Sequence, residues 1–325
     1  MMETFRIAIV SDIHYAAAVE RERCLHFDDR VIKSPAARLL GRFFKRFIWL
    51  RDWGGHNHLL DRFLAEAGQP DLVVANGDYS CNTGFVGVSN PAAFASAEEC
   101  LGKLRGRFGA QFRATIGDHE LGKISMFVTH GSMQLESWRR TVAGLGLEPF
   151  WRVQFGKYVL LGVTSSLIAL PAFLTDIPAG EEAEWQRLRE IHLGKIRAAF
   201  ASLDPCERVL LFCHDPTALP FLWREPVVQQ RIPQVEQTII GHLHSNLLLW
   251  NSQILSVLPP INFLGRGVTK VSAALRESRL WKPFRVRLCP ALTGIQLLKD
   301  GGYLTVELTA DASQPAKFAF HPLKW

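Results

Sequence analysis

The sequence lacks the features that would point to an oxidising compartment or to a bilayer. Its six cysteines are scattered over 325 residues without a Cys-x-x-Cys pair, so we expect free thiols rather than a disulfide framework. No apolar run reaches the roughly 18 residues of a membrane-spanning helix. The first strand-like segment begins at Phe5, with no signal-peptide apolar region before it. These absences predict a cytoplasmic protein.

The chain also has no internal repeat, no low-complexity segment and no clear linker, which favours a single domain over residues 1–325. With 48% hydrophobic and 21% charged residues, it can bury a large core, and this composition argues against disorder. The net charge of +6 favours an anionic partner such as a nucleotide, a nucleic acid, a phospholipid or a membrane surface.

Short apolar runs alternate with helical patterns, which predicts an α/β fold. We expect strands at Phe5–Val10, Asp71–Ala75, Phe112–Ile116, Trp151–Phe155, Tyr158–Val163, Arg208–Cys213 and Gln237–Ile240, and one or two more within 247–258. We expect helices at Pro91–Phe108, Gln134–Leu145 and Glu181–Leu203. The tail predicts a hairpin of Gly294–Leu298 and Tyr303–Leu308 around a turn at Asp300.

Side chains suited to metal binding follow five of these apolar runs. They are Asp12 and His14, Asp78, Asp118 and His119, His214, and His242 and His244. Because α/β folds place their sites beyond the carboxyl ends of the strands, we expect these groups to converge. Gly77, Gly117 and Gly241 each precede one of them, where glycine lets the backbone turn sharply and approach a metal closely.

Carboxylates and imidazoles together suit Mn²⁺, Zn²⁺ or Fe, and the absence of thiolates argues against a structural zinc site. Three neighbouring aspartates would repel one another strongly unless cations lay between them. The alternative is that these residues are helix caps or hydrogen-bonded buried polar groups, which would have to hold at all five places at once.

In their order, the five blocks resemble the motifs of the calcineurin-like metallophosphoesterases: Asp-x-His, Gly-Asp, Gly-Asn-His-Glu/Asp, His and Gly-His-x-His. Here they read Asp12-Ile13-His14, Gly77-Asp78, Gly117-Asp118-His119-Glu120, His214 and Gly241-His242-Leu243-His244. The resemblance covers residues 5 to about 245. It implies a four-layer αββα sandwich, in which two mixed sheets are flanked by helices, with a dinuclear metal centre at the strand ends.

The resemblance also implies a role for each residue. One divalent ion would be held by Asp12, His14 and His244, and the second by Asp118, His214 and His242, with Asp78 bridging the two. His119 would be the catalytic residue that stabilises the phosphoryl oxygens or protonates the leaving oxygen. The implied reaction is hydrolysis of a phosphoester or pyrophosphate bond by a metal-bridging water. Mn²⁺ is the expected metal, with Fe or Zn as alternatives.

One position departs from the family pattern, because Asp118 stands where the family has asparagine. Aspartate also ligates through oxygen, so a metal site is still expected. Its additional negative charge should hold cations more tightly and make the bridging water less acidic.

A basic amphipathic insertion at 33–53 separates the first two blocks. On a helix, one broad side would carry Leu39, Leu40, Phe43, Phe44, Phe47, Ile48 and Leu50, and the opposite side Arg38, Arg42, Lys45 and Arg46. This pattern is typical of an interfacial helix on anionic lipid, with Arg42, Phe43, Phe44, Lys45, Arg46 and Phe47 in contact with the membrane or the substrate. The alternative is a core-packing helix with a basic solvent face. A second basic–aromatic segment, 276–287, would be another surface contact or a lid strand.

These two segments favour a substrate that has both phosphate and acyl chains. Within the superfamily that the motifs resemble, the bacterial UDP-2,3-diacylglucosamine pyrophosphatases act on such a substrate, so we expect a lipid-linked substrate and peripheral contact with the inner face of a membrane. The alternatives are a soluble phosphodiesterase or phosphatase acting on nucleotides or phosphoproteins, and a non-catalytic scaffold on this fold. Nucleic acid is a poorer partner, because the basic residues accompany aliphatic as well as aromatic side chains.

Overall fold

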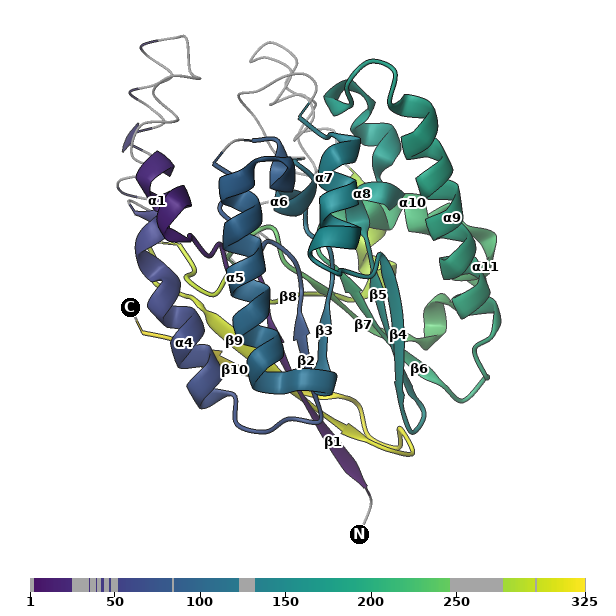
Figure 1. Cartoon of the computed structure of the whole chain (residues 1–325). Coiled ribbons are helices and arrows are strands. Elements are labelled where there is room, and N and C mark those ends of the chain that lie inside the picture. The colour runs from purple at the N-terminus through teal and green to yellow at the C-terminus, as the bar shows by residue number, and fades with distance from the viewer. Residues whose placement is uncertain are drawn as a thin grey trace.

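The computed structural model describes residues 3–24, 52–83, 85–122, 132–245, 277–295 and 297–324, together with the single residues Pro35, Leu39, Arg42, Phe43 and Phe47. Figure 1 shows the strands in the middle of the molecule and helices on both outer sides. Within the described ranges, every helix is too short or too polar to cross a bilayer.

The first sheet has five strands in the order β10-β9-β1-β2-β3. They are β1 (Thr4–Val10), β2 (Leu72–Ala75), β3 (Phe112–Ala114), β9 (Gly302–Thr309) and β10 (Lys317–Pro322). β1, β2 and β3 run parallel, whereas β9 is antiparallel to both β1 and β10. The residues of β1 from Ile7 to Val10 and all those of β2 are buried on both faces, as expected for central strands of a covered sheet.

The second sheet also has five strands, in the order β4-β5-β6-β7-β8. They are β4 (Phe150–Phe155), β5 (Tyr158–Val163), β6 (Arg208–Cys213), β7 (Val235–Ile240) and β8 (Val286–Leu288). β4 and β5 form an antiparallel hairpin, and β5 to β8 run parallel. Both sheets are therefore mixed, as predicted.

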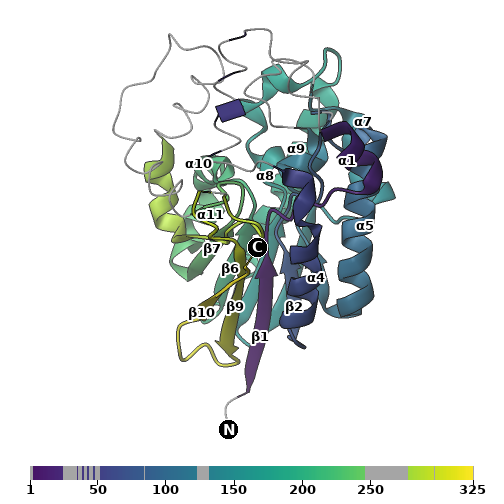
Figure 2. The same ribbon diagram turned by 90° about the vertical axis from the view of Figure 1, so that its left-hand side faces the viewer.

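Helices cover the outer face of each sheet and lie on opposite sides of the view in Figure 1, and Figure 2 looks onto the layer that is at the left of Figure 1. The longer α-helices are α4 (Asn57–Glu66) and α5 (Pro91–Phe108) on the first sheet, and α9 (Glu182–Ala201) on the second. The shorter ones are α1 (Ala18–Cys24), α6 (Asp118–Leu121), α7 (Leu135–Arg139), α8 (Ser165–Ile168), α10 (Leu219–Trp223) and α11 (Pro226–Arg231). A π-helical turn, η4 (Arg140–Gly144), continues α7.

The 3₁₀ helices are η1 (Trp53–His56), η2 (Gly87–Ser89), η3 (Gly109–Gln111), η5 (Leu170–Ala172), η6 (Leu174–Asp176), η7 (Pro216–Ala218), η8 (Ile232–Gln234) and η9 (Glu277–Phe284). Three apolar cores separate the four layers. One lies between α4, α5 and the first sheet, one between the two sheets, and one between α9, α10 and the second sheet. This arrangement confirms the predicted αββα sandwich.

Strand alternation produces these layers directly. Ile7 and Ile9 of β1 belong to the core between the sheets, whereas Ala8 and Val10 belong to the core under the helices. Trp151 of β4 lies between the sheets, and its indole N–H donates to the carbonyl oxygen of Ala114 in β3 over 3.0 Å. This hydrogen bond links the two sheets through a buried polar group.

Local sequence signals account for α5, whose bounds match the prediction. The Asn90 side chain accepts a hydrogen bond from the Ala92 amide over 2.9 Å, and Pro91 occupies the first turn. The helix ends at Gly109, which has a φ of +53°. The predicted strands at Phe5–Val10, Tyr158–Val163 and Arg208–Cys213 are confirmed with shifts of one residue at most.

The predicted C-terminal hairpin is wrong. The first predicted strand, Gly294–Leu298, is not a strand where the structure describes it. This segment forms a tight loop, in which Asp300 accepts a hydrogen bond from the Ile295 amide over 3.1 Å. Gly294 within it has a φ of +66°. The hairpin of the tail is instead β9 with β10. The strands predicted within 247–258 lie outside the described residues.

We expect Gly162→Ala to lower the free energy of unfolding by about 1–3 kcal/mol, because a Cβ at this position of β5 would overlap the Trp151 ring between the sheets. Denaturant unfolding measures the change. The matched control is Gly194→Ala on the exposed side of α9, where no atom lies within 4 Å of the added Cβ and helix propensity predicts a gain of up to about 1 kcal/mol. Equal effects of the two substitutions would contradict the packing described here.

Candidate metal centre

The structure brings all eight predicted site residues to the same end of the two sheets. Asp12 and His14 follow β1, Asp78 follows β2, and Asp118 begins α6 just beyond β3. From the second sheet, His214 follows β6, and His242 and His244 follow β7. This is the end at which the parallel strands terminate, opposite the N-terminus in Figures 1 and 2.

The first cluster consists of Asp12, His14 and His244, each at most 7% exposed as a side chain. The Nε2 atoms of the two histidines lie 3.1 Å apart. Asp12 Oδ1 lies 4.0 Å from His14 Nε2 and 3.4 Å from His244 Nε2. His14 Nδ1 faces the carbonyl oxygen of Ser80 at 3.3 Å. Because a carbonyl only accepts, the proton sits on Nδ1, and the Nε2 lone pair of His14 points into the cluster.

The second cluster consists of Asp78, Asp118, His214 and His242. His214 Nε2 lies 3.0 Å from Asp78 Oδ2 and 2.8 Å from Asp118 Oδ1, and His242 Nδ1 lies 3.1 Å from the same Asp118 oxygen. His214 Nδ1 donates to the carbonyl oxygen of Asn76 over 2.6 Å. His242 is the outermost member, with one third of its side chain exposed.

Asp78 lies between the clusters. One of its carboxylate oxygens, a ring nitrogen of His14 and a ring nitrogen of His119 all lie within 4.8 Å of one another. Asp78 is therefore in reach of donors of both clusters, which is what a bridging ligand requires.

Five of these residues have a backbone conformation that side chains rarely adopt. The φ angles are +50° at Asp12, +48° at His14, +60° at Asp78, +62° at His242 and +57° at His244. Each such residue costs about 1–3 kcal/mol, and strain of this kind concentrates at functional sites. The strained backbone conformation at these five residues thus directs their side chains toward one another.

The three predicted glycines make room for this convergence. Gly77 has a φ of +94°, and a Cβ there would lie 2.6 Å from His214 Nδ1. A Cβ at Gly117 would overlap Asp78, and one at Gly241 would overlap the side chains of Ser11 and Asp12. A side chain at any of the three positions would push a cluster residue out of place.

Burial and mutual charge set the protonation of the histidines. Burial and the neighbouring His119 lower the pKa of His14 to about 3. Burial and His14 hold the pKa of His244 well below its usual value. Burial would lower the pKa of His214 too, but the carboxylates of Asp78 and Asp12 hold it well above its usual value. In the absence of cations, His214 therefore carries a proton that balances the carboxylates, and a cation would displace it.

For the carboxyl groups, burial raises the pKa instead of lowering it. Burial raises the pKa of Asp12 to about 6, and burial together with the charge of Asp78 raises the pKa of Glu120 to about 7. Burial and Asp118 would raise the pKa of Asp78, but the imidazoles of His214 and His119 outweigh them and keep it below its usual range. A bound cation would favour the ionised form of every one of these groups.

The donor set fits two cations. Metal–nitrogen and metal–oxygen bonds of about 2.0–2.2 Å place neighbouring ligand atoms about 3–3.5 Å apart, and most of the distances within each cluster are of this size. His214 Nε2 is buried and makes no well-aligned hydrogen bond within the described part of the chain, although two carboxylate oxygens lie within 3.0 Å. A buried donor atom directed at carboxylates in this way suits a metal ligand.

His119 lies at the opening of the site, with 15% of its side chain exposed. Its amide donates to Asp78 Oδ1 over 2.9 Å, and its Nδ1 donates to the carbonyl of Ser80 over 3.1 Å. Its Nε2 lies 3.8 Å from Asp78 Oδ2. His119 is thus oriented by the carbonyl that also orients His14, and its Nε2 lies on the side of Asp78.

Two polar groups that the sequence did not single out support the centre. The carbonyl of Ser80 fixes the rings of His14 and His119, and no residue type signals such a role. Asn76 orients His214 through its carbonyl, while its side-chain amide reaches the carbonyl of Ile239 in β7 at 3.4 Å. The Asn76-Gly77-Asp78 run at the end of β2 was the available signal for Asn76.

Within the 33–53 insertion, the structure describes Asp52 and Trp53 at its end and the single residues Pro35, Leu39, Arg42, Phe43 and Phe47, and these five are helical and exposed. Leu39, Phe43 and Phe47 are four residues apart and 69%, 58% and 51% exposed, and the two phenylalanine rings lie 4.8 Å apart. These three side chains form an exposed apolar stripe, which the core-packing alternative does not predict for them. Phe44, Lys45 and Arg46 lie outside the described residues.

The second basic–aromatic segment divides its residues differently. Trp281 and Phe284 are buried in the core between the second sheet and its helices, whereas Arg279, Lys282, Arg285 and Arg287 are exposed. The segment forms η9 and the edge strand β8. Trp281 and Phe284 therefore pack inward and the basic side chains lie on the surface, and the surface contact itself stays a prediction.

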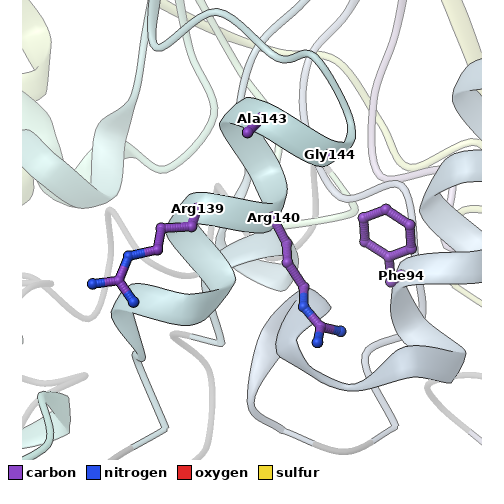
Figure 3. A pocket seen from close by; sticks show the side chains of 5 residues that line it. All are labelled: Phe94, Arg139, Arg140, Ala143 and Gly144. Atoms are coloured by element: carbon purple, nitrogen blue, oxygen red, sulfur yellow. The ribbon is translucent and has the colours of Figure 1, made fainter.

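A depression of about 330 Å³ lies elsewhere, lined by Phe94, Arg139, Arg140, Ala143 and Gly144 (Figure 3). Both arginines pair with Glu136 of α7, at 3.9 Å from Arg139 and 2.8 Å from Arg140. Arg140 also donates to the carbonyl of Ser89 over 3.1 Å. The two guanidinium groups thus have partners within the protein, and no cluster residue lines the depression.

The comparison with protein families agrees with the motifs. The model of the family described as calcineurin-like phosphoesterase matches residues 5–246, a range that contains both clusters. No curated protein sequence matches the chain.

Similar solved structures include a purple acid phosphatase from yellow lupin (Lupinus luteus) seeds and a dimetal phosphatase from Danio rerio. The lupin enzyme is 12% identical with a TM-score of 0.38, over 75% of this chain and 38% of the lupin chain. The Danio rerio protein is 11% identical with a TM-score of 0.45, over 98% of this chain and 97% of that one. A phosphopantetheinyl hydrolase from Mycobacterium tuberculosis is 14% identical with a TM-score of 0.34, over 73% and 82% of the two chains. Likenesses at this level carry no argument about function.

We expect Asp118→Asn to remain active within about tenfold and to bind the ion of the second cluster about 10-fold more weakly, because the amide keeps one ligating oxygen but removes a negative charge. Isothermal titration with Mn²⁺ measures the affinities. Asp118→Ala, which removes the oxygen altogether, is the control and should lose that ion. If Asp118→Asn bound no metal while the native chain bound two ions, the position assigned to Asp118 would be wrong.

Proposed function

The chain belongs to the calcineurin-like phosphoesterase family, and from this premise we propose that it uses two divalent metal ions to hydrolyse a phosphoester or pyrophosphate bond in a lipid-linked substrate. The observation that supports the catalytic part is the meeting of seven metal-binding side chains in two adjoining clusters. Three carboxylates and four imidazoles in one buried site suit Mn²⁺ first, with Fe or Zn as alternatives.

In this proposal, Asp12, His14 and His244 would hold one ion, Asp118, His214 and His242 would hold the other, and Asp78 would be a ligand of both. Bound cations would supply the charge that activates a water for attack on phosphorus and that offsets the charge of the phosphoryl oxygens.

The protein's own residues orient His119 toward the substrate and exclude bulk water from the site. The carbonyl of Ser80 holds Nδ1–H of His119, so that its Nε2 can hydrogen-bond to a phosphoryl oxygen or, when protonated, donate to the leaving oxygen. The depth of the clusters, in which all members except His242 are at most 7% exposed, keeps bulk water from competing with the substrate.

The lipid part of the proposal is supported by the exposed apolar stripe of Leu39, Phe43 and Phe47. Large apolar side chains on one face of a helical segment, in a chain with a net charge of +6, suit an anionic membrane surface or the acyl chains of a substrate. UDP-2,3-diacylglucosamine combines a pyrophosphate with two acyl chains and is the specific substrate we propose. Its cleavage would take place on the cytoplasmic face of a membrane.

Replacing His119 by alanine separates chemistry from metal binding. We expect His119→Ala to bind two Mn²⁺ ions like the native chain and to lose a factor of about 10²–10⁴ in kcat on a generic phosphodiester, because a general acid or a phosphoryl hydrogen bond is removed. Metal content by mass spectrometry and the rate with bis(p-nitrophenyl) phosphate are the measurements. Loss of an ion in this variant would instead make His119 a ligand, as its place beside His14 and Asp78 also allows.

Polar substitution of the exposed apolar stripe tests the lipid part. We expect Leu39→Ser, Phe43→Ser and Phe47→Ser together to lower the rate on UDP-2,3-diacylglucosamine in phosphatidylglycerol vesicles by at least about 10-fold relative to the rate on a soluble phosphodiester, since each exposed apolar side chain contributes about 1.5–3 kcal/mol when buried in lipid. Release of UMP and vesicle co-sedimentation are measured.

The control for this experiment is Ile191→Ser, which changes an exposed apolar residue of α9 and should leave both rates unchanged. An unaltered ratio in the triple variant, with no vesicle binding by the native chain, would favour a soluble phosphodiesterase acting on nucleotides or phosphoproteins.

A further inference from the structure

A further buried carboxylate, beside the three aspartates of the clusters, adjoins them without belonging to either cluster. Glu120 lies in α6, two residues after Asp118, and its side chain is fully buried. Its oxygens accept three backbone hydrogen bonds. Oε2 accepts from the amides of Gly117 over 2.9 Å and Asp78 over 3.1 Å, and Oε1 accepts from the amide of Tyr79 over 2.8 Å. A carboxylate can take all three because both of its oxygens are acceptors.

The three donors belong to two different loops. Asp78 and Tyr79 follow β2, whereas Gly117 precedes Asp118 at the end of β3. The Asp118 loop also donates a hydrogen bond to the Asp78 loop, from the amide of His119 to Asp78 Oδ1 over 2.9 Å. A closed set of hydrogen bonds thus joins the loop that carries Asp78 to the loop that carries Asp118.

The backbone at Asp78 needs such support. Its φ of +60° is unfavourable for a residue with a side chain, and such strain persists only where the surroundings fix it. Glu120 accepts hydrogen bonds from the amides of Asp78 and Tyr79, which lie on either side of the strained Cα of Asp78. At Gly117, an added Cβ would lie 2.9 Å from Glu120 Oε2 and would overlap Asp78, so the close approach of the two loops depends on glycine there.

We propose that Glu120 is a positioning residue whose carboxylate holds the Asp78 and Asp118 loops at the separation that the second metal-ion cluster requires. The inference rests on the proposed dinuclear function. Its effect should be larger at the second cluster, to which both Asp78 and Asp118 belong, because Asp12, His14 and His244 lie on loops to which Glu120 makes no hydrogen bond among those the structure describes.

The test is Glu120→Gln, which keeps the size of the side chain but replaces one acceptor oxygen with an NH₂ group that faces a backbone N–H. Isothermal titration with Mn²⁺ should show the second ion bound about 10- to 100-fold more weakly and the first ion affected less, because only the shared ligand Asp78 is loosened at the first cluster. Electron paramagnetic resonance should show loss of the spin-coupled Mn²⁺ pair at ion concentrations that saturate the native site. A role in folding alone would lower stability and leave both affinities unchanged.

Two further variants make the result specific. Glu120→Asp retains the carboxylate on a shorter side chain, and its second-ion affinity should lie between those of Glu120→Gln and the native chain. Glu181→Gln changes another carboxylate that accepts a backbone N–H, from Leu135 over 2.7 Å, away from the clusters, and should bind both ions as the native chain does.

The outcomes are distinguishable. Two ions bound with native affinity by Glu120→Gln would overturn the role of Glu120 and leave the proposed function standing. Fewer than two ions in the native chain would overturn the proposed function, and this inference with it. If Glu120→Gln did not fold, Glu120→Asp would decide, and a second-ion affinity equal to the native value would overturn the proposal.

Discussion

The repulsion among three buried aspartates is the constraint on which the rest of this structure depends. Asp12, Asp78 and Asp118 are at most 1% exposed, and oxygens of Asp78 and Asp118 lie within 4.8 Å of each other. At such a distance this pair of like charges costs about 4 kcal/mol with an effective dielectric constant near 20. The fold holds them there because His214, whose pKa the carboxylates of Asp78 and Asp12 raise, carries a proton among them, and cations would offset the remaining charge.

Two sheets are needed to build this arrangement. The first contributes the three carboxylates and His14, and the second contributes His214, His242 and His244. Two hydrogen bonds through the core join the sheets. The Trp151 side chain donates to the carbonyl of Ala114, and the Asn76 side chain donates to the carbonyl of Ile239. The packing of the buried parallel strands thus stabilises the cluster residues in their unfavourable backbone conformation with positive φ.

The sequence predicts the frame and the site well where periodicity and strand ends decide the outcome. The bounds of α5 follow from Asn90, Pro91 and Gly109, and the convergence of the ligands follows from the rule that parallel strands place sites at their carboxyl ends. Roles carried by backbone groups are invisible to such reasoning. The carbonyls of Ser80 and Asn76 orient three histidines, yet any residue could supply a carbonyl.

Two other segments depend on tertiary packing. Leu304 and its neighbours were predicted to form one half of a hairpin, but the other half is β10, because the residues before Asp300 form a tight loop held by its carboxylate. The basic–aromatic pattern of 276–287 does not indicate which side chains are buried, and η9 packs Trp281 into the core beside exposed arginines. In both cases the local pattern was compatible with two structures, and long-range packing chose between them.

The central claim is that two cations occupy the two donor clusters, and anomalous X-ray diffraction from crystals grown with Mn²⁺ tests it most directly. The account predicts two anomalous peaks, one among Asp12, His14 and His244 and one among Asp118, His214 and His242, with Asp78 touching both. A map with no peak at these side chains, or with a single ion ligated elsewhere, would contradict it.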